Sequence, residues 1–186
     1  MKKYIGALAL AAATTIGSVY AGDAQPGYVD FGKLSPTEGA EFVEVNVNSN
    51  LIAMVTNFAR KQEPEIAEAL GGLKSIRVNV LGVNDANRES IEKRMKSVRA
   101  QLDGSGWERL VTVIKDNDDV GVFMKMRGAE VVEGVVVTVL KGKDQAVFVN
   151  IVGDIRPDKL ATVGERFNIE PLKHLPAKPD EHASAK

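Results

Sequence analysis

Residues 131–152 read VVEGVVVTVLKGKDQAVFVNIV, and this stretch decides the fold. Two runs rich in β-branched and aromatic residues, Val131 to Leu140 and Ala146 to Val152, flank a short polar turn, which predicts an antiparallel hairpin. Half-buried strands alternate apolar and polar side chains, but alternation fails in both runs. We therefore expect strands that are apolar on both faces. Helices would cover one face of their sheet, and the remaining segments or a second copy of the chain would cover the other.

The rest of the chain supplies further strands, with alternating apolar residues, and helices, with apolar residues three and four positions apart. The predicted strands are Phe42 to Val47, Ser75 to Leu81, Trp107 to Lys115 and Val120 to Arg127. The predicted helices are Asn50 to Arg60, a short one from Pro64 to a left-handed cap at Gly71-Gly72, Ala86 to Leu102, and a last one that begins at Pro157. The expected fold is α+β, an antiparallel or mixed sheet with a C-terminal β-meander and two to three helices packed on one face.

The N-terminal segment has the features of an export signal. A basic start at Lys2-Lys3 precedes the apolar run Ile5 to Ala13, and small residues near Ala21 suit a signal peptidase. The run is shorter than the about 20 apolar residues of a transmembrane helix. We expect residues 1–21 to be cleaved, leaving a soluble periplasmic or secreted protein that begins near Gly22. The alternative is an apolar N-terminal helix that is retained as an anchor.

The length of the mature chain fits one domain. We expect a leader at residues 22–40, with one short strand at Tyr28 to Phe31, and then a single α+β domain at residues 41–169. Residues 170–186 combine prolines with small and charged residues, which is typical of a disordered tail.

The composition excludes several classes of chemistry. The chain has no cysteine, which rules out disulfides, thiol catalysis, thiolate zinc sites and iron–sulfur clusters. Its two histidines, His174 and His182, lie in the predicted tail, so the core lacks the usual general base. The chain has 24 basic and 25 acidic residues, and loss of Lys2 and Lys3 leaves 22 against 25. This near-neutral balance gives no reason to expect nucleic acid or anionic lipid as a partner.

An acidic cluster is the one candidate metal site. Asp116, Asp118 and Asp119 could offer hard oxygen ligands to calcium. The EF-hand pattern is not met, because Arg127 stands at the twelfth position, where that loop needs a bidentate acid. We favour a solvated hairpin turn, and we assign no catalytic residue, cofactor or metal.

Paired carboxylates are the remaining route to catalysis, since Asp and Glu can act as acid and base in dry sites. The candidates are Glu130, Glu133, Asp144 and Asp154, which we interpret as solvated strand ends. Asn150 interrupts an apolar run, and if it is buried it must be hydrogen-bonded. We favour a structural hydrogen bond for Asn150 over a ligand contact.

The C-terminal half of the chain resembles a bacterial family known as domain of unknown function 4252. The resemblance covers about residues 40–167. It rests on the pattern of a strand, a glycine and two further strands, followed by Asn150-x-x-Gly153 before the last helix. It implies a small exported protein, with no established activity, ligand or catalytic residue. Many relatives look like lipoproteins, but this chain has no cysteine at the cleavage site, so membrane attachment is not implied.

The sequence favours a non-catalytic binding or interaction module of the cell envelope over an enzyme. Its partner would be another protein, not yet specified, or a second copy of the chain. Two alternatives remain open. One is a carboxylate-based, calcium-dependent binder or hydrolase, and the other is a carrier that holds an apolar ligand between helix and sheet.

Overall fold

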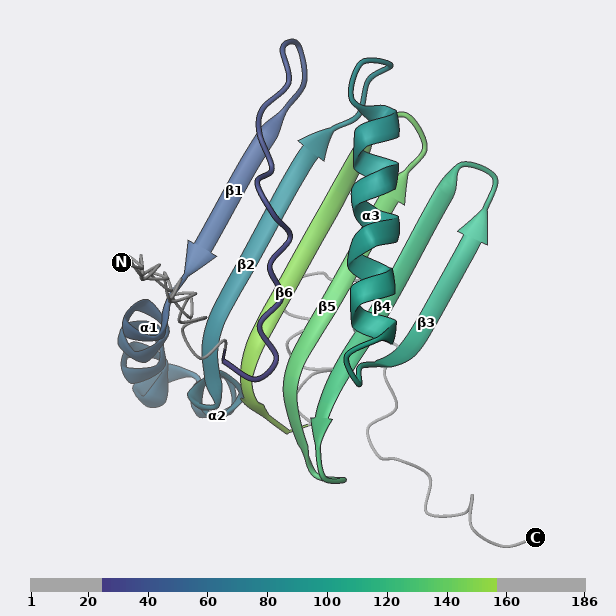
Figure 1. Ribbon diagram of the computed structural model, residues 1–186. Coiled ribbons are helices and arrows are strands. Elements are labelled where there is room, and N and C mark those ends of the chain that lie inside the picture. The colour runs from purple at the N-terminus through teal and green to yellow at the C-terminus, as the bar shows by residue number, and fades with distance from the viewer. Residues whose placement is uncertain (1–24, 157–186) are drawn as a thin grey trace, which may run out of the picture.

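A computed structural model describes residues 25–156. Within them, six strands form one antiparallel sheet in the order β1-β2-β6-β5-β4-β3, and three helices accompany it (Figure 1). The elements are β1 (Phe42–Val47), α1 (Ser49–Gln62), α2 (Pro64–Gly71), β2 (Leu73–Gly82), α3 (Arg88–Asp103), β3 (Glu108–Lys115), β4 (Asp118–Arg127), β5 (Val131–Lys141) and β6 (Gln145–Ile155). The predicted α+β fold is confirmed, and β3 to β6 form the C-terminal meander. The export signal, the helix expected from Pro157 and the tail with both histidines lie outside the described residues.

One face of the sheet is covered by α3 together with the segment before β1. This segment, residues 25–34, is called the strap here, and it runs across β2 and β6 beside α3 (Figure 1). Its residues Val29 and Phe31 are 2% and 0% exposed, and the Phe31 ring packs 5.5 Å from that of Phe148 on β6. The strap was expected to be a leader with a strand at Tyr28 to Phe31. It forms no strand, but it belongs to the hydrophobic core.

The opposite face holds a second core, to which α1 and α2 contribute Ile52 and Leu70. In Figure 1, both helices lie at one end of the sheet, near the end of β1 and the start of β2. The apolar side chains of α1 form a stripe along the helix, and only part of this stripe faces the core. Ile52 and Ala59 are buried, but Phe58 is 71% exposed. The stripe is half exposed because α1 packs against α2 and β2, near the start of β2, and does not lie across the sheet (Figure 1).

The central strands are apolar on both faces, as expected from their sequence. Val135 and Val137 belong to the core that includes Ile52, and Val136 belongs to the core under α3. All three are at most 1% exposed. β5 therefore lies between two cores, which explains why its sequence does not alternate.

Two glycines permit a close approach between the start of β2 and the end of β6. A Cβ at Gly72 would lie 2.1 Å from the Asp154 carbonyl oxygen, and a Cβ at Gly153 would lie 2.3 Å from the Gly72 carbonyl oxygen. The Asp154 amide donates to that same Gly72 oxygen at 2.8 Å. The left-handed cap predicted at Gly71-Gly72 is wrong, because Gly72 has a φ of −89°. Gly72 is needed for space and not for a positive φ.

We expect Gly153→Ala to destabilise the protein by about 1–3 kcal/mol, because the added methyl group overlaps backbone atoms that cannot move independently. Gly71→Ala is the matched control, because a Cβ there meets nothing within 4 Å. It should leave the free energy of unfolding unchanged or raise it by up to about 1 kcal/mol. Urea denaturation measures the free energy of unfolding of both variants. An equal loss of stability in the two variants would contradict the close approach of the backbones at Gly72 and Gly153.

Candidate functional site

Asn150 fixes the strap to the centre of the sheet. It is 0% exposed and lies on β6, on the face that the strap crosses. Its Oδ1 accepts a hydrogen bond from the Val29 amide at 3.0 Å, and its Nδ2 donates to the carbonyl oxygens of Gly27 and Val135 at 2.9 and 3.2 Å. A buried amide side chain is costly unless its donors and acceptor are satisfied. Asn150 is thus a structural residue. The strap is not paired with a strand, and the Asn150 side chain supplies hydrogen bonds to its backbone instead.

The strap approaches β5 more closely than side chains would allow. A Cβ at Gly27 would lie 1.9 Å from the Glu133 carbonyl oxygen, and a Cβ at Gly134 would lie 2.5 Å from the Gly27 Cα. Gly27 also has a φ of +84°, in the left-handed region that favours glycine. The backbone contact and the Asn150 hydrogen bonds place the following residues, Tyr28 and Val29, over the neighbouring strand β2.

An open groove of about 440 Å³ lies between the strap, the end of β1 and the first half of β2. It is lined mainly by amide, hydroxyl and aromatic side chains, with one charged group, Arg77. The lining residues are Gln25, Tyr28, Asn46, Val47, Asn48, Ser75 and Arg77. This set, called the Arg77 groove below, combines a cation with polar groups that can donate hydrogen bonds.

Arg77 is held in place by the strap. Its Nη1 donates to the Tyr28 hydroxyl at 2.7 Å and lies 3.5 Å from the Val29 carbonyl oxygen. The guanidinium carbon stands 5.3 Å from the centre of the Tyr28 ring and 5.8 Å from that of the Phe31 ring, within the range of cation–π attraction. Within residues 25–156, the hydrogen bonds of this guanidinium use Nη1 alone, which leaves Nε and Nη2 as donors for a ligand.

The groove has one cation in its lining and one carboxylate beside it, because the lining residue Asn46 donates to Glu44 Oε1 at 3.0 Å. The planar guanidinium of an arginine carries one positive charge. Asn48, which caps α1 by accepting the Leu51 amide at 3.0 Å, also lines the groove, so the partial positive charge of the α1 N-terminus lies nearby. A carboxylate matches the planar guanidinium fork in shape and charge. The sequence did not single out Arg77, because alternation marks it only as a polar position of a strand.

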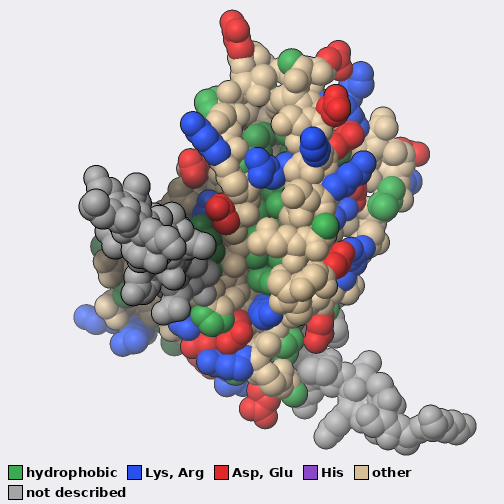
Figure 2. Space-filling model, viewed as in Figure 1, with side chains coloured by type: hydrophobic (Ala, Val, Ile, Leu, Met, Phe, Trp, Pro, Cys, Tyr) green, Lys and Arg blue, Asp and Glu red, His purple; other side chains and the backbone are tan. Residues whose placement is uncertain are grey.

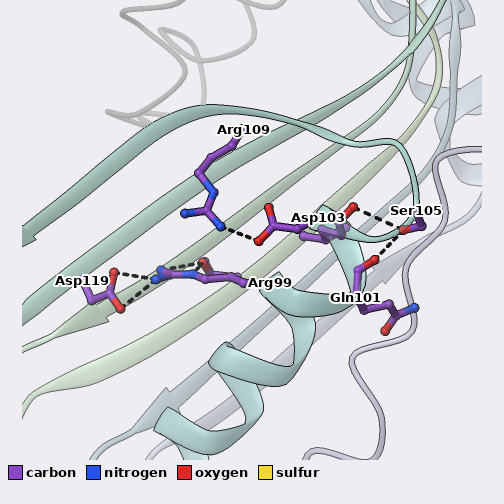
Figure 3. A network of polar contacts seen from close by, with 8 residues as sticks. Arg99, Gln101, Asp103, Ser105, Arg109 and Asp119 are labelled. Carbon is purple, nitrogen blue, oxygen red and sulfur yellow. Dashed lines mark hydrogen bonds and ion pairs between the residues drawn. The ribbon is translucent and has the colours of Figure 1, made fainter.

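The candidate calcium ligands are already engaged. Asp119 accepts from Arg99 Nη1 at both oxygens, at 2.7 and 2.8 Å (Figure 3). The same guanidinium donates to the buried Thr138 hydroxyl at 3.0 and 3.2 Å, which ties α3 to β4 and β5. Asp118 accepts from the Gly142 amide at 2.8 Å. Asp116, with a φ of +55°, occupies the hairpin turn.

The surroundings of this acidic turn are mixed in charge, because α3 brings Glu92 as well as basic residues to them. A groove of about 240 Å³ separates it from α3 and includes Arg88 and Lys96 in its lining. Among residues 25–156, no group of three or more His, Asp or Glu side chains has a metal-binding arrangement. The carboxylates therefore serve as hydrogen-bond acceptors within the fold.

Two of the four candidate catalytic carboxylates do come together. Arg127 contacts Glu133 at 3.6 Å and Asp154 at 2.7 Å, and Lys74 contacts Asp154 at 3.2 Å. The hydrogen bond from Lys74 lowers the pKa of the Asp154 carboxyl, and the charges of Lys74 and Arg127 act in the same direction. A general acid needs a raised pKa. This cluster is an ion-pair network at the end of the sheet.

The visible surface of the α3 side has no large region of one charge sign. Figure 2 shows acidic and basic side chains interspersed over this face. Within residues 25–156, none of the helices has both the length and the apolar character to span a bilayer.

We expect Asn150→Leu to lower the free energy of unfolding by about 3 kcal/mol or more. It removes the buried acceptor of the Val29 amide and the donor to the Gly27 and Val135 carbonyl oxygens. Asn57→Leu on the exposed side of α1 is the control and should change stability by no more than about 0.5 kcal/mol. Urea denaturation followed by circular dichroism compares them. A similar stability of Asn150→Leu and the wild type would contradict the role given to Asn150.

We expect calcium at millimolar concentration to leave the melting temperature unchanged, because Arg99 and the Gly142 amide already occupy Asp119 and Asp118. A ligand that binds only the native state would raise it. Differential scanning fluorimetry with calcium, and with magnesium as a control, makes the comparison. A calcium-specific rise that disappears in Asp118→Ala would establish a metal site at this turn.

Comparison with known proteins places this architecture in a family. No curated protein and no solved structure matches the chain. The family model described as Domain of unknown function (DUF4252) matches residues 36–163, which include all the strands and helices described above. The match spans more than half of the chain, and the chain belongs to the DUF4252 family.

Proposed function

We propose that this protein is a non-catalytic binding module of the cell envelope and that its Arg77 groove holds an acidic group of its partner. The observation that carries this proposal is the geometry of Arg77. The strap orients its guanidinium through Tyr28 and Val29, and Arg77 lines an open groove that also contains amide and hydroxyl groups. A prearranged cation of this kind binds a carboxylate without the entropic cost of ordering a flexible side chain.

The chemistry of the chain supports binding over catalysis. Cysteine is absent, and both histidines fall outside the described residues. Of the four carboxylates considered for an acid–base pair, Asp154 is paired with Lys74 and Arg127, and Glu133 is paired with Arg127. The basic and apolar start of the sequence, followed by small residues, supports an envelope location.

The apolar-ligand alternative requires space between α3 and the sheet. Met95 and Leu102 of α3 and Phe123 of β4 fill this layer and are 2%, 0% and 0% exposed. The Arg77 groove, in contrast, is open and already lined by hydrogen-bonding groups. Native mass spectrometry of the purified protein tests the alternative directly, because a co-purified lipid-like mass would favour the carrier.

The test is an NMR titration of isotope-labelled protein with glutarate, a small carboxylate probe, at constant ionic strength maintained with chloride. We expect saturable shifts at the side-chain amides of Gln25, Asn46 and Asn48. Arg77→Gln should abolish them, and Arg77→Lys should weaken binding several-fold because an ammonium lacks the guanidinium fork.

Arg127→Gln is the matched control, because it removes an equally charged, exposed arginine that pairs with Asp154. It should retain the full response to glutarate. Shifts that do not saturate, or that persist unchanged in Arg77→Gln, would overturn the assignment of the groove.

A further inference from the structure

One edge of the sheet is an apolar strand that lacks a pairing partner within residues 25–156. β3 is the terminal strand of the sheet beyond β4. Leu110, Val113 and Ile114 are 40%, 46% and 74% exposed. Edge strands of this kind pair with other chains unless charges, prolines or a covering segment protect them. Between Arg109 and Lys115, β3 contains only Leu, Val, Thr and Ile.

The two edges of the sheet differ in protection. β1, the opposite edge, is six residues long and has Glu44 near its middle. On β3, the one arginine is engaged on the α3 side of the sheet. Arg109 contacts Asp103 of α3 at 2.5 Å (Figure 3). Its guanidinium carbon also stands 5.2 Å from the centre of the Phe123 ring. The charge of Arg109 therefore does not protect the free edge of β3 from pairing with another strand.

We propose that two copies of this chain pair antiparallel through the outer edges of β3, about a two-fold axis perpendicular to the sheet. The paired sheets would form one continuous sheet across the dimer. Both edges would then satisfy backbone N–H and C=O groups that otherwise bind water. The Arg77 groove lies at the β1–β2 edge, so the dimer carries one groove at each far end.

The sequence of β3 is complementary to itself in this arrangement. The register of β3 against β4 shifts between Arg109 and Val111, which brings Glu108 onto the same face as Val111, Val113 and Lys115. With Thr112 on the two-fold axis, Val111 lies opposite Val113 of the second copy, and the bulge at Leu110 lies opposite Ile114. Glu108 then lies opposite Lys115 of the second copy.

The charges and shapes of the side chains are therefore complementary between the two copies of β3 at both ends of the strand. Glu108 and Lys115 have no ion-pair partner among the residues that the structure describes, so each is available across the interface. Opposite charges and β-branched pairs facing each other across antiparallel strands are stabilising. The same strand paired in parallel would place like charges side by side.

The test is sedimentation equilibrium of the purified protein over a wide concentration range. We expect a reversible monomer–dimer equilibrium. Thr112→Lys places two ammonium groups together on the axis and should raise the dissociation constant at least tenfold. Val45→Lys on the β1 edge, a site 42% exposed, is the matched control and should leave the equilibrium unchanged.

Exchanging the charges of Glu108 and Lys115 tests the proposed register between the two β3 strands. Glu108→Lys and Lys115→Glu should each weaken the dimer, and the double variant should restore it. Circular dichroism shows whether each variant is folded. A monomer at millimolar concentration, or a dimer that Val45→Lys weakens and Thr112→Lys does not, would overturn the proposal. Thr112→Lys should still bind glutarate, so failure of the dimer is distinguishable from failure of the Arg77 groove.

Discussion

The hydrogen bonds of Asn150 determine how the N-terminal part of this domain is arranged. Asn150 lies inside a sheet face that is otherwise apolar, and its amide group satisfies two backbone groups of the strap and one of β5. The strap can reach it only because Gly27 and Gly134 allow the two backbones to touch. Once fixed, the strap covers Phe148 with Phe31 and brings Tyr28 against Arg77. A buried structural contact thus determines the position of an exposed cation.

The strands and helices were readable from sequence because their signals are local. β1 has the predicted bounds, and the predicted meander is present as β3 to β6. Local periodicity does not show which side of an amphipathic helix finds a partner. α1 buries Ile52 and exposes Phe58 because α2 and β2 cover only part of its stripe. That outcome depends on tertiary packing.

The candidate site was less predictable than the fold. Asn150 stood out because it interrupts an apolar run, but its partners are more than 120 residues away in sequence at Gly27 and Val29. The sequence indicated only a leader with a short strand at Tyr28 to Phe31, and this local signal does not predict that the strap is buried against β6. The acidic turn gave a visible signal in the sequence, but Arg99 lies on another element and neutralises Asp119. Contacts between distant segments thus decide the chemistry in each case.

The central claim is that Asn150 holds the strap as a folded part of the domain. Hydrogen exchange of the Val29 amide tests it most directly, because this amide lies in an element without regular secondary structure and its hydrogen bond goes to a side chain. The account predicts protection of Val29 close to that of core amides in β6, since the hydrogen bond is buried and breaks only with the strap contacts. Exchange of Val29 at the rate of an unstructured peptide, while the β6 amides stay protected, would contradict it.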